Sequence, residues 1–127
     1  MRKITLNKSD TNITLVNQEN LSLVIDGFDP SDLLAAALAK CTAGEVRKRA
    51  SKHGYDLQNL TVRVDLSRDR ATKTAHFLVH LEMEGNLTEQ EIKKLNKYAS
   101  KSYIRRALSN NIAFKNDVHY NGSKIDF

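Results

Sequence analysis

The chain of 127 residues contains only one cysteine, Cys41, and no long apolar run. A single cysteine excludes an intrachain disulfide, so the fold must be held by packing, and it fits a reducing compartment. No stretch reaches the length that spans a bilayer, and polar residues follow Arg2 and Lys3 at the place where a signal peptide has its apolar core. We therefore expect a cytoplasmic protein with no membrane partner.

Residues for holding a metal or a phosphate group are sparse as well. The five glycines are scattered, so none belongs to a glycine-rich phosphate loop. His76 and His80 would stand about 13 Å apart on a strand, which is too far for one ion. We expect neither a metal nor a cofactor.

Basic residues exceed acidic ones by 20 to 15, a net charge of +5. The length suits one domain with a real core, and we assign residues 1–127 to a single domain. A basic run with interleaved tyrosines allows nucleic-acid binding as one reading, although Glu89 and Glu91 dilute it and a solvated face is the other reading. The run consists of Lys93, Lys94, Lys97, Lys101, Arg105 and Arg106, with Tyr98 and Tyr103 nearby.

The first half of the chain reads as strands followed by a long helix. Short apolar runs at 4–6, 13–16 and 21–25 predict a three-stranded meander. Asp29 as N-cap, Pro30 in the first turn and Asp32 mark a helix start, and the helix continues to about Gly54. The first half of this helix is apolar on every side, so we expect it to be buried all round.

The second half of the chain predicts two strands, then two helices and a closing strand. Strict alternation at 60–66 and 75–84 predicts a β-hairpin. Thr88 and Glu91 have capping-box spacing before an amphipathic helix that includes Ala99. A short helix is expected from about Ser102 to Ser109. Residues 118–120 are typical of a closing strand, which ends at an Asn-Gly turn. The fold class is therefore α+β: N-terminal antiparallel strands, a long central helix, a hairpin and two C-terminal helices.

The segment 29–43 carries a distinctive pattern, Pro-x-x-Leu-Leu-x-Ala-x-x-x-x-Cys, that ends at Cys41. Together with Gly-Tyr-Asp-Leu at 54–57 and the segment 99–108, it resembles the OsmC/Ohr family of bacterial proteins, over roughly residues 20 to 120. The resemblance implies an intertwined, obligate homodimer with the central helices inside and the reactive sites at the interface between subunits.

The resemblance also implies an activity, the reduction of organic hydroperoxides: a cysteine thiolate attacks the peroxide, the sulfenic acid condenses with a second, resolving cysteine, and an external dithiol resets the disulfide. The family also uses a glutamate just after the motif proline and an arginine from the N-terminal sheet, whose guanidinium lowers the pKa of the thiol. Cys41 occupies the position of the attacking cysteine. Ser102 replaces the resolving cysteine, and Ser31, beside Asp32, replaces the family's glutamate. The family's arginine is missing, because no arginine occurs from Lys3 to Phe28.

Other residues are candidates for the missing roles. Glu45 and Arg49 follow Cys41 at intervals of four on one helix face, and Arg105 lies three positions after Ser102. The alternative readings are a helix-surface ion pair for Glu45 and Arg49, a solvated Arg105, and a helix N-cap for Ser102.

Two readings of Cys41 itself remain open. It is either a small core hydrophobe or the reactive atom, and a mid-helix cysteine receives no help from its own helix N-terminus. The leading hypothesis is a thiol-dependent hydroperoxide reductase that acts through Cys41 in a one-cysteine mode in oxidative stress defence. The second is a protein that has lost this chemistry and binds a small apolar or oxidised ligand at the dimer interface, and nucleic-acid binding is the third.

Overall fold

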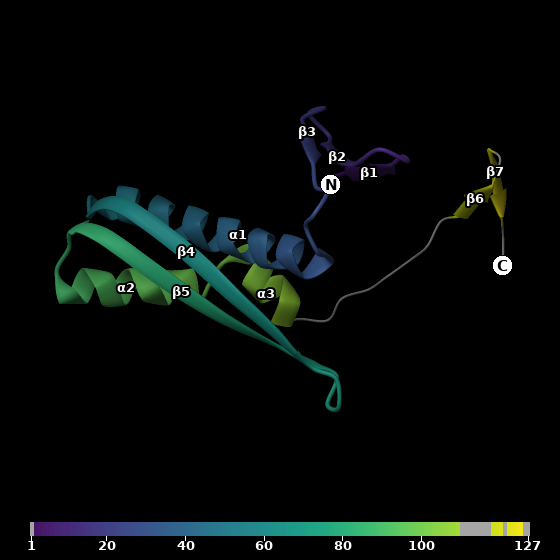
Figure 1. The fold of residues 1–127 in the computed structure, drawn as a ribbon. Coiled ribbons are helices and arrows are strands. Elements are labelled where there is room, and N and C mark those ends of the chain that lie inside the picture. Colours follow the sequence, from purple (N-terminus) through teal and green to yellow (C-terminus); the bar gives the residue numbers. More distant parts are fainter. Residues whose placement is uncertain (1, 110–117, 121, 126–127) are drawn as a thin grey trace. The chain divides into compact units, whose positions relative to one another are not determined.

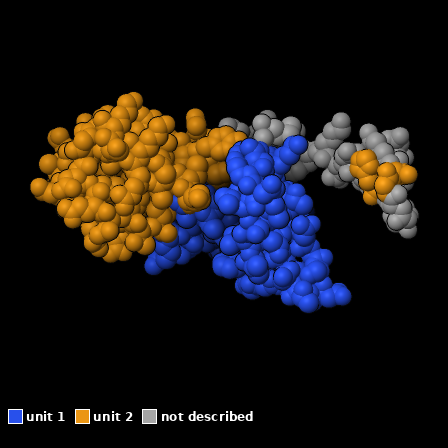
Figure 2. All heavy atoms as spheres, turned by 90° about the horizontal axis from the view of Figure 1, so that it is seen from above, with its two compact units in different colours: residues 1–39, 63–80 blue, residues 40–62, 81–127 orange. Residues whose placement is uncertain are grey.

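A computed structural model describes residues 2–109, 118–120 and 122–125 (Figure 1). The chain forms two compact units, residues 1–39 with 63–80 and residues 40–62 with 81–127 (Figure 2). Each unit is described by itself below. The assignment of residues 1–127 to a single domain stays a prediction. Within the described residues, no helix is both long and apolar enough to cross a membrane.

The first unit begins with an antiparallel sheet of β1 (Ile4–Lys8), β2 (Ile13–Asn17) and β3 (Ser22–Val24), in that order. Polar turns join the strands: the Asn17 side chain accepts hydrogen bonds from the backbone of Glu19 and Leu21, both at 3.0 Å. The predicted meander is confirmed.

Helix α1 (Pro30–His53) has the predicted start and end. The Asp29 carbonyl accepts from Leu33 N at 3.2 Å, and Asp32 Oδ2 accepts from Asp29 N at 2.9 Å. Asp29 thus stands at the N-cap position, although the capping side chain is that of Asp32. At the other end Gly54 has φ +69°, and Tyr55 N donates to Ala50 O at 2.9 Å, which is a Schellman ending.

The expected burial of the first half of α1 on every side is not met within one chain. Leu38 is 2 % exposed, whereas Leu34 is 39 % exposed, and Ala36 and Ala37 are exposed as well. Apolar side chains around a whole helix need neighbours around the whole helix. The described part of a single chain supplies these on one side only.

Strands β4 (Asp56–Asp69) and β5 (Thr74–Asn86) form a two-stranded sheet (Figure 1). The short connection at 70–73 makes the pair antiparallel, so the predicted hairpin is confirmed, with longer strands than expected. Alternate residues are half-buried as predicted, at positions Leu60, Val62, Val64, Leu66, Phe77, Val79, Leu81 and Met83.

The chain continues with α2 (Glu89–Ala99), α3 (Tyr103–Ser109), β6 (Val118–Tyr120) and β7 (Ser123–Ile125). Thr88 and Glu91 form the predicted capping box. Strands β6 and β7 pair antiparallel, and the predicted Asn-Gly turn begins at residue 121, outside the described residues. The core of the second unit joins α1 to α2 through Val46, Ala50, Leu95 and Ala99, against which Tyr55, Leu57, Leu60, Leu81, Met83 and Leu87 pack.

Gly85 near the end of β5 is required by its surroundings. Its φ is +151°, and a methyl group on its Cα would overlap Asp56 O and lie 3.1 Å from Gln58 N. Gly85→Ala is therefore expected to lower the free energy of unfolding by about 2 kcal/mol or more, measured by urea denaturation.

The matched control is Gly44→Ala in α1, where a methyl group meets nothing within 4 Å. It should raise stability by roughly 0.5–1 kcal/mol, because alanine restricts the unfolded chain. Equal urea midpoints for the two variants would contradict the assignment of Gly85 as a close-approach glycine.

Candidate functional site

Cys41 lies in α1 and is half-buried, next to the fully buried Thr42. Its Sγ accepts a hydrogen bond from the backbone N–H of Ile104, with an N to S distance of 3.4 Å. The sulfur is therefore held against the first turn of α3. It is neither sealed in the core nor free in solvent.

The hydrogen bond to Cys41 replaces a cap that α3 would otherwise have. Ser102 precedes the helix, and its carbonyl accepts from Arg106 N at 3.0 Å, so its backbone stands at the N-cap position. An N-cap hydroxyl normally accepts from the second or third N–H of the helix. Here the second N–H, that of Ile104, points at Cys41 Sγ.

The Ser102 side chain is consequently an orphan. It is 1 % exposed, and its Oγ has no hydrogen-bond partner among the described residues. Ser102 is the N-cap by backbone position, as one reading predicted, but its hydroxyl does not cap. The nearby Thr42 Oγ1 is also buried without a partner in the described part of the chain.

Glu45 and Arg49 pair with each other one and two turns after Cys41. Arg49 Nε lies 2.9 Å from Glu45 Oε1, and the side chains are 32 % and 22 % exposed for Arg49 and Glu45. The Arg49 guanidinium also covers the Tyr98 ring at 4.7 Å, and Tyr98 stacks on His53. The ion pair of the alternative reading is present and half-buried, and within the described residues no hydrogen bond joins it to the sulfur, so a Cys41–Glu45–Arg49 stripe stays a prediction.

Ser31 has an arginine partner that the sequence did not reveal. Arg68 Nη2, near the end of β4, donates to Ser31 Oγ in the first turn of α1. The two residues are 37 positions apart, and no motif spacing connects them. Asp32 is engaged with the Asp29 backbone, so neither substituted residue is brought to Cys41 by these contacts.

Other basic residues are exposed or are paired with acidic neighbours, and Arg47 donates to the backbone carbonyls of Leu57 and Gln58. Arg105 is exposed on α3 and has no ion pair among the described residues, whereas Lys93 lies 3.5 Å from Glu89. Arg2 holds both carboxylate oxygens of Glu19, at 2.7 and 2.9 Å. This hydrogen bonding lowers the pKa of the exposed Glu19 carboxyl and raises that of Arg2.

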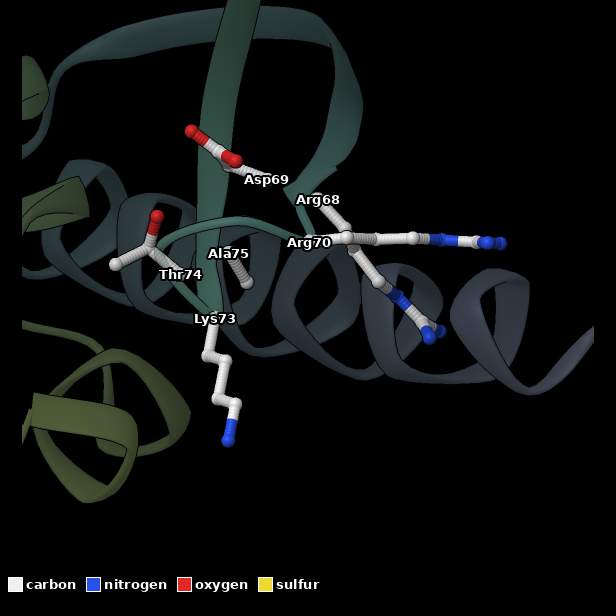
Figure 3. A pocket seen from close by; sticks show the side chains of 6 residues that line it. All are labelled: Arg68, Asp69, Arg70, Lys73, Thr74 and Ala75. Carbon is white, nitrogen blue, oxygen red and sulfur yellow. The ribbon is translucent and has the colours of Figure 1, made fainter.

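The hairpin tip carries a basic opening of about 320 Å³ (Figure 3). Arg68 and Arg70 extend to one side in this view and Lys73 to another, while Asp69 Oδ1 accepts from Ala71 N at 3.0 Å. Thr74 and Ala75 complete the lining. The opening contains no thiol or imidazole, and no group of three metal-binding side chains exists among the described residues.

The buried Ser102 hydroxyl, which has no hydrogen-bond partner among the described residues, leads to a prediction about stability. Ser102→Ala should raise the free energy of unfolding by about 1 kcal/mol, because it removes a hydroxyl that is desolvated without a hydrogen bond. Thr88→Ala is the matched control, since Thr88 Oγ1 accepts from Glu91 N at 3.2 Å, and it should lose about 1 kcal/mol. Urea denaturation at one protein concentration compares them, and equal losses would mean that Ser102 does cap α3.

Several solved structures share this fold. The OsmC-like protein from Mycoplasma pneumoniae is similar at a TM-score of 0.74 and 21 % identity, over 86 % of this chain and 87 % of that one. The organic hydroperoxide resistance protein OhrB of Bacillus subtilis is similar at 0.59 and 18 %, over 87 % and 92 %. An organic hydroperoxide resistance protein OsmC from Legionella pneumophila is similar at 0.64 and 18 %, over 87 % and 90 %. The predicted α+β fold of the OsmC/Ohr type is confirmed.

The sequence comparisons agree with the fold. No curated protein sequence matches the chain. Residues 24–116, which include α1, the hairpin, α2 and α3, match the family described as OsmC-like protein. Because this match spans most of the chain, the chain belongs to the OsmC-like protein family.

Proposed function

We propose that this chain is a thiol-dependent hydroperoxide reductase that acts through Cys41 in a one-cysteine mode, in oxidative stress defence. Membership of the OsmC-like family and the solved relatives named as organic hydroperoxide resistance proteins support the proposal. The observation that carries it is the half-buried Cys41 sulfur, which receives the N–H of Ile104 at 3.4 Å. A cysteine that only filled the core would need no such donor.

The proposed reaction begins at the sulfur. Cys41 Sγ attacks one peroxide oxygen, the O–O bond breaks, and the other oxygen leaves as an alcohol after taking a proton. The sulfur is oxidised by two electrons to a sulfenic acid, and the peroxide is reduced by two. An external thiol then displaces water to form a mixed disulfide, and a second thiol releases Cys41 as the thiol.

The one-cysteine mode follows from the residues present. Cys41 is the single cysteine of the chain, and the residue at the family's resolving position is Ser102, which cannot form a disulfide. The reductant must therefore come from outside the subunit. The Ile104 N–H supports the nucleophile, because a fixed backbone donor stabilises negative charge on the atom it points at.

The Glu45–Arg49 pair is the candidate replacement for the family's carboxylate and guanidinium, and Arg49 would have to leave its present contacts with Glu45 and Tyr98 to reach the sulfur. Glu45 holds Arg49 at 2.9 Å on the helix that carries Cys41. Along the helix axis Glu45 lies about 6 Å and Arg49 about 12 Å beyond Cys41. Arg105 is exposed on α3 and is the weaker candidate. In this proposal Ser31 and Asp32 serve the start of α1, through Arg68 and Asp29, and have no part in the chemistry.

The direct test uses tert-butyl hydroperoxide with excess dithiothreitol and a dione probe for sulfenic acids. The native protein should consume peroxide over many turnovers and carry the probe on Cys41 when the reductant is omitted. Cys41→Ser should do neither. No labelling of Cys41 under excess peroxide would reject the reductase and favour a protein that only binds a small apolar ligand. Salt-sensitive retention on nucleic acid, without reaction with peroxide, would favour nucleic-acid binding by the basic run.

We also propose that the working form is a homodimer. Cross-strand partners share one face of a sheet, and the register aligns Leu6 with Leu15 and Leu15 with Leu23. This face of β1–β3 is apolar and largely open: Leu6 is 54 % and Leu23 is 61 % exposed. A second copy of the chain would bury both this apolar sheet face and the exposed apolar side chains of α1.

Sedimentation equilibrium at micromolar concentration should therefore give a dimer of the 127-residue chain. Leu23→Lys should shift it toward the monomer by placing a charge on the apolar face. Ser22→Lys adds the same charge to the opposite face, since successive strand residues alternate, and should leave the dimer intact. A native monomer would reject the proposal, and equal weakening by both substitutions would reject the assigned face.

A further inference from the structure

We propose that oxidised Cys41 condenses with the backbone nitrogen of Ile104 to form a cyclic sulfenyl amide, which takes the place of the missing intramolecular disulfide. The inference rests on the proposed function, because it needs the sulfenic acid that a hydroperoxide produces. Condensation of a sulfenic acid with a backbone nitrogen is a known branch of cysteine oxidation. A backbone nitrogen from another helix already contacts this sulfur: Ile104 N donates to Cys41 Sγ at 3.4 Å.

The position of Ile104 makes its nitrogen available. It is the second residue of α3, and the first N–H groups of a helix have no partner within the helix. Replacing this N–H by an N–S bond therefore breaks no backbone hydrogen bond. Closing the remaining distance is feasible because α3 has seven residues, none of them buried, and can shift without disrupting a core.

A second observation at the same place is the orphan hydroxyl of Ser102. Its Oγ is buried without a partner among the described residues, although a buried hydroxyl is normally hydrogen-bonded. Ser102 stands at the N-cap position of α3, two residues before Ile104, so its buried hydroxyl belongs to the same helix start as the nitrogen that contacts Cys41 Sγ. A hydroxyl group on the oxidised sulfur would give Ser102 Oγ a partner, and Ser102 can donate to that oxygen as it leaves as water.

The step is balanced without a further redox partner. The S–O bond of the sulfenic acid and the N–H bond of Ile104 break, an S–N bond forms, and one water leaves. The oxidation state of sulfur does not change. An external thiol then attacks the sulfur, the S–N bond breaks, the nitrogen regains its proton, and the mixed disulfide of the proposed cycle results. The amide protects the sulfur from oxidation to the sulfinic acid.

The test treats reduced full-length protein with one equivalent of tert-butyl hydroperoxide, without thiol, and follows the intact mass. A sulfenic acid adds one oxygen, whereas the sulfenyl amide is lighter than the thiol form by two hydrogens. We expect the lighter monomer, a fragment-ion link between Cys41 and Ile104, and return to the starting mass with dithiothreitol.

Two substitutions test whether the nitrogen of Ile104, and not that of the adjacent residue, reacts with the sulfur. Replacing Ile104 by its α-hydroxy acid turns the N–H into an ester oxygen and should abolish the lighter species, so that sulfenic and sulfinic acids accumulate. Tyr103→Pro removes the adjacent N–H at the first helical position, where proline is tolerated, and should keep it. Circular dichroism checks that both variants fold.

The outcomes distinguish the inference from the proposed function. Oxygen addition at Cys41 without the lighter monomer, or a Cys41–Cys41 disulfide of twice the mass, would overturn the sulfenyl amide and leave the reductase standing. Persistence of the lighter species in the Ile104 ester would also overturn it. An unchanged mass under excess peroxide would reject both.

Discussion

The packing of α1 against α2 determines the surroundings of Cys41. Val46 and Ala50 on α1 meet Leu95 and Ala99 on α2, and all four are buried. Once Ala99 is fixed, only a short turn separates it from Ser102, because Ser100 N and Lys101 N donate back to the last turn of α2. Helix α3 must then begin beside α1, and its second N–H meets the sulfur. A few apolar contacts thus position a backbone donor without any dedicated polar side chain.

This arrangement changes what the residue at position 102 does. A cysteine there would offer a second sulfur, and a functioning N-cap serine would compete with Cys41 for the Ile104 N–H. The observed Ser102 does neither, since its hydroxyl is buried and unbonded within the described residues. The site is therefore organised around one sulfur and main-chain groups.

The parts that could be predicted from sequence are those with local causes. The capping box at Thr88, the Schellman glycine at 54 and the period of β4 each depend on residues a few positions apart. The donor to Cys41 was not predictable in this way, because a backbone N–H looks the same at every position. The Arg68–Ser31 contact could not be predicted for a related reason, because it joins segments that are distant in sequence and share no motif. Leu34 shows the limit of composition, since an all-apolar helix predicts burial but does not say which chain provides it.

The family's N-terminal arginine is absent from this chain, and the charges around Cys41 explain how a backbone N–H can stand in its place. A guanidinium beside a thiolate supplies a full positive charge, but it must itself be held by a carboxylate and desolvated with it. Glu45 and Arg49 already form such a pair, which Tyr98 covers at 4.7 Å from the guanidinium, so bringing Arg49 to the sulfur would sacrifice both contacts. A main-chain N–H supplies less charge but requires no counterion, and the fold already fixes it in place. In the proposed reductase, a sulfur supported in this way should react more slowly than one beside an arginine, and slow turnover would make protection of its oxidised form more important.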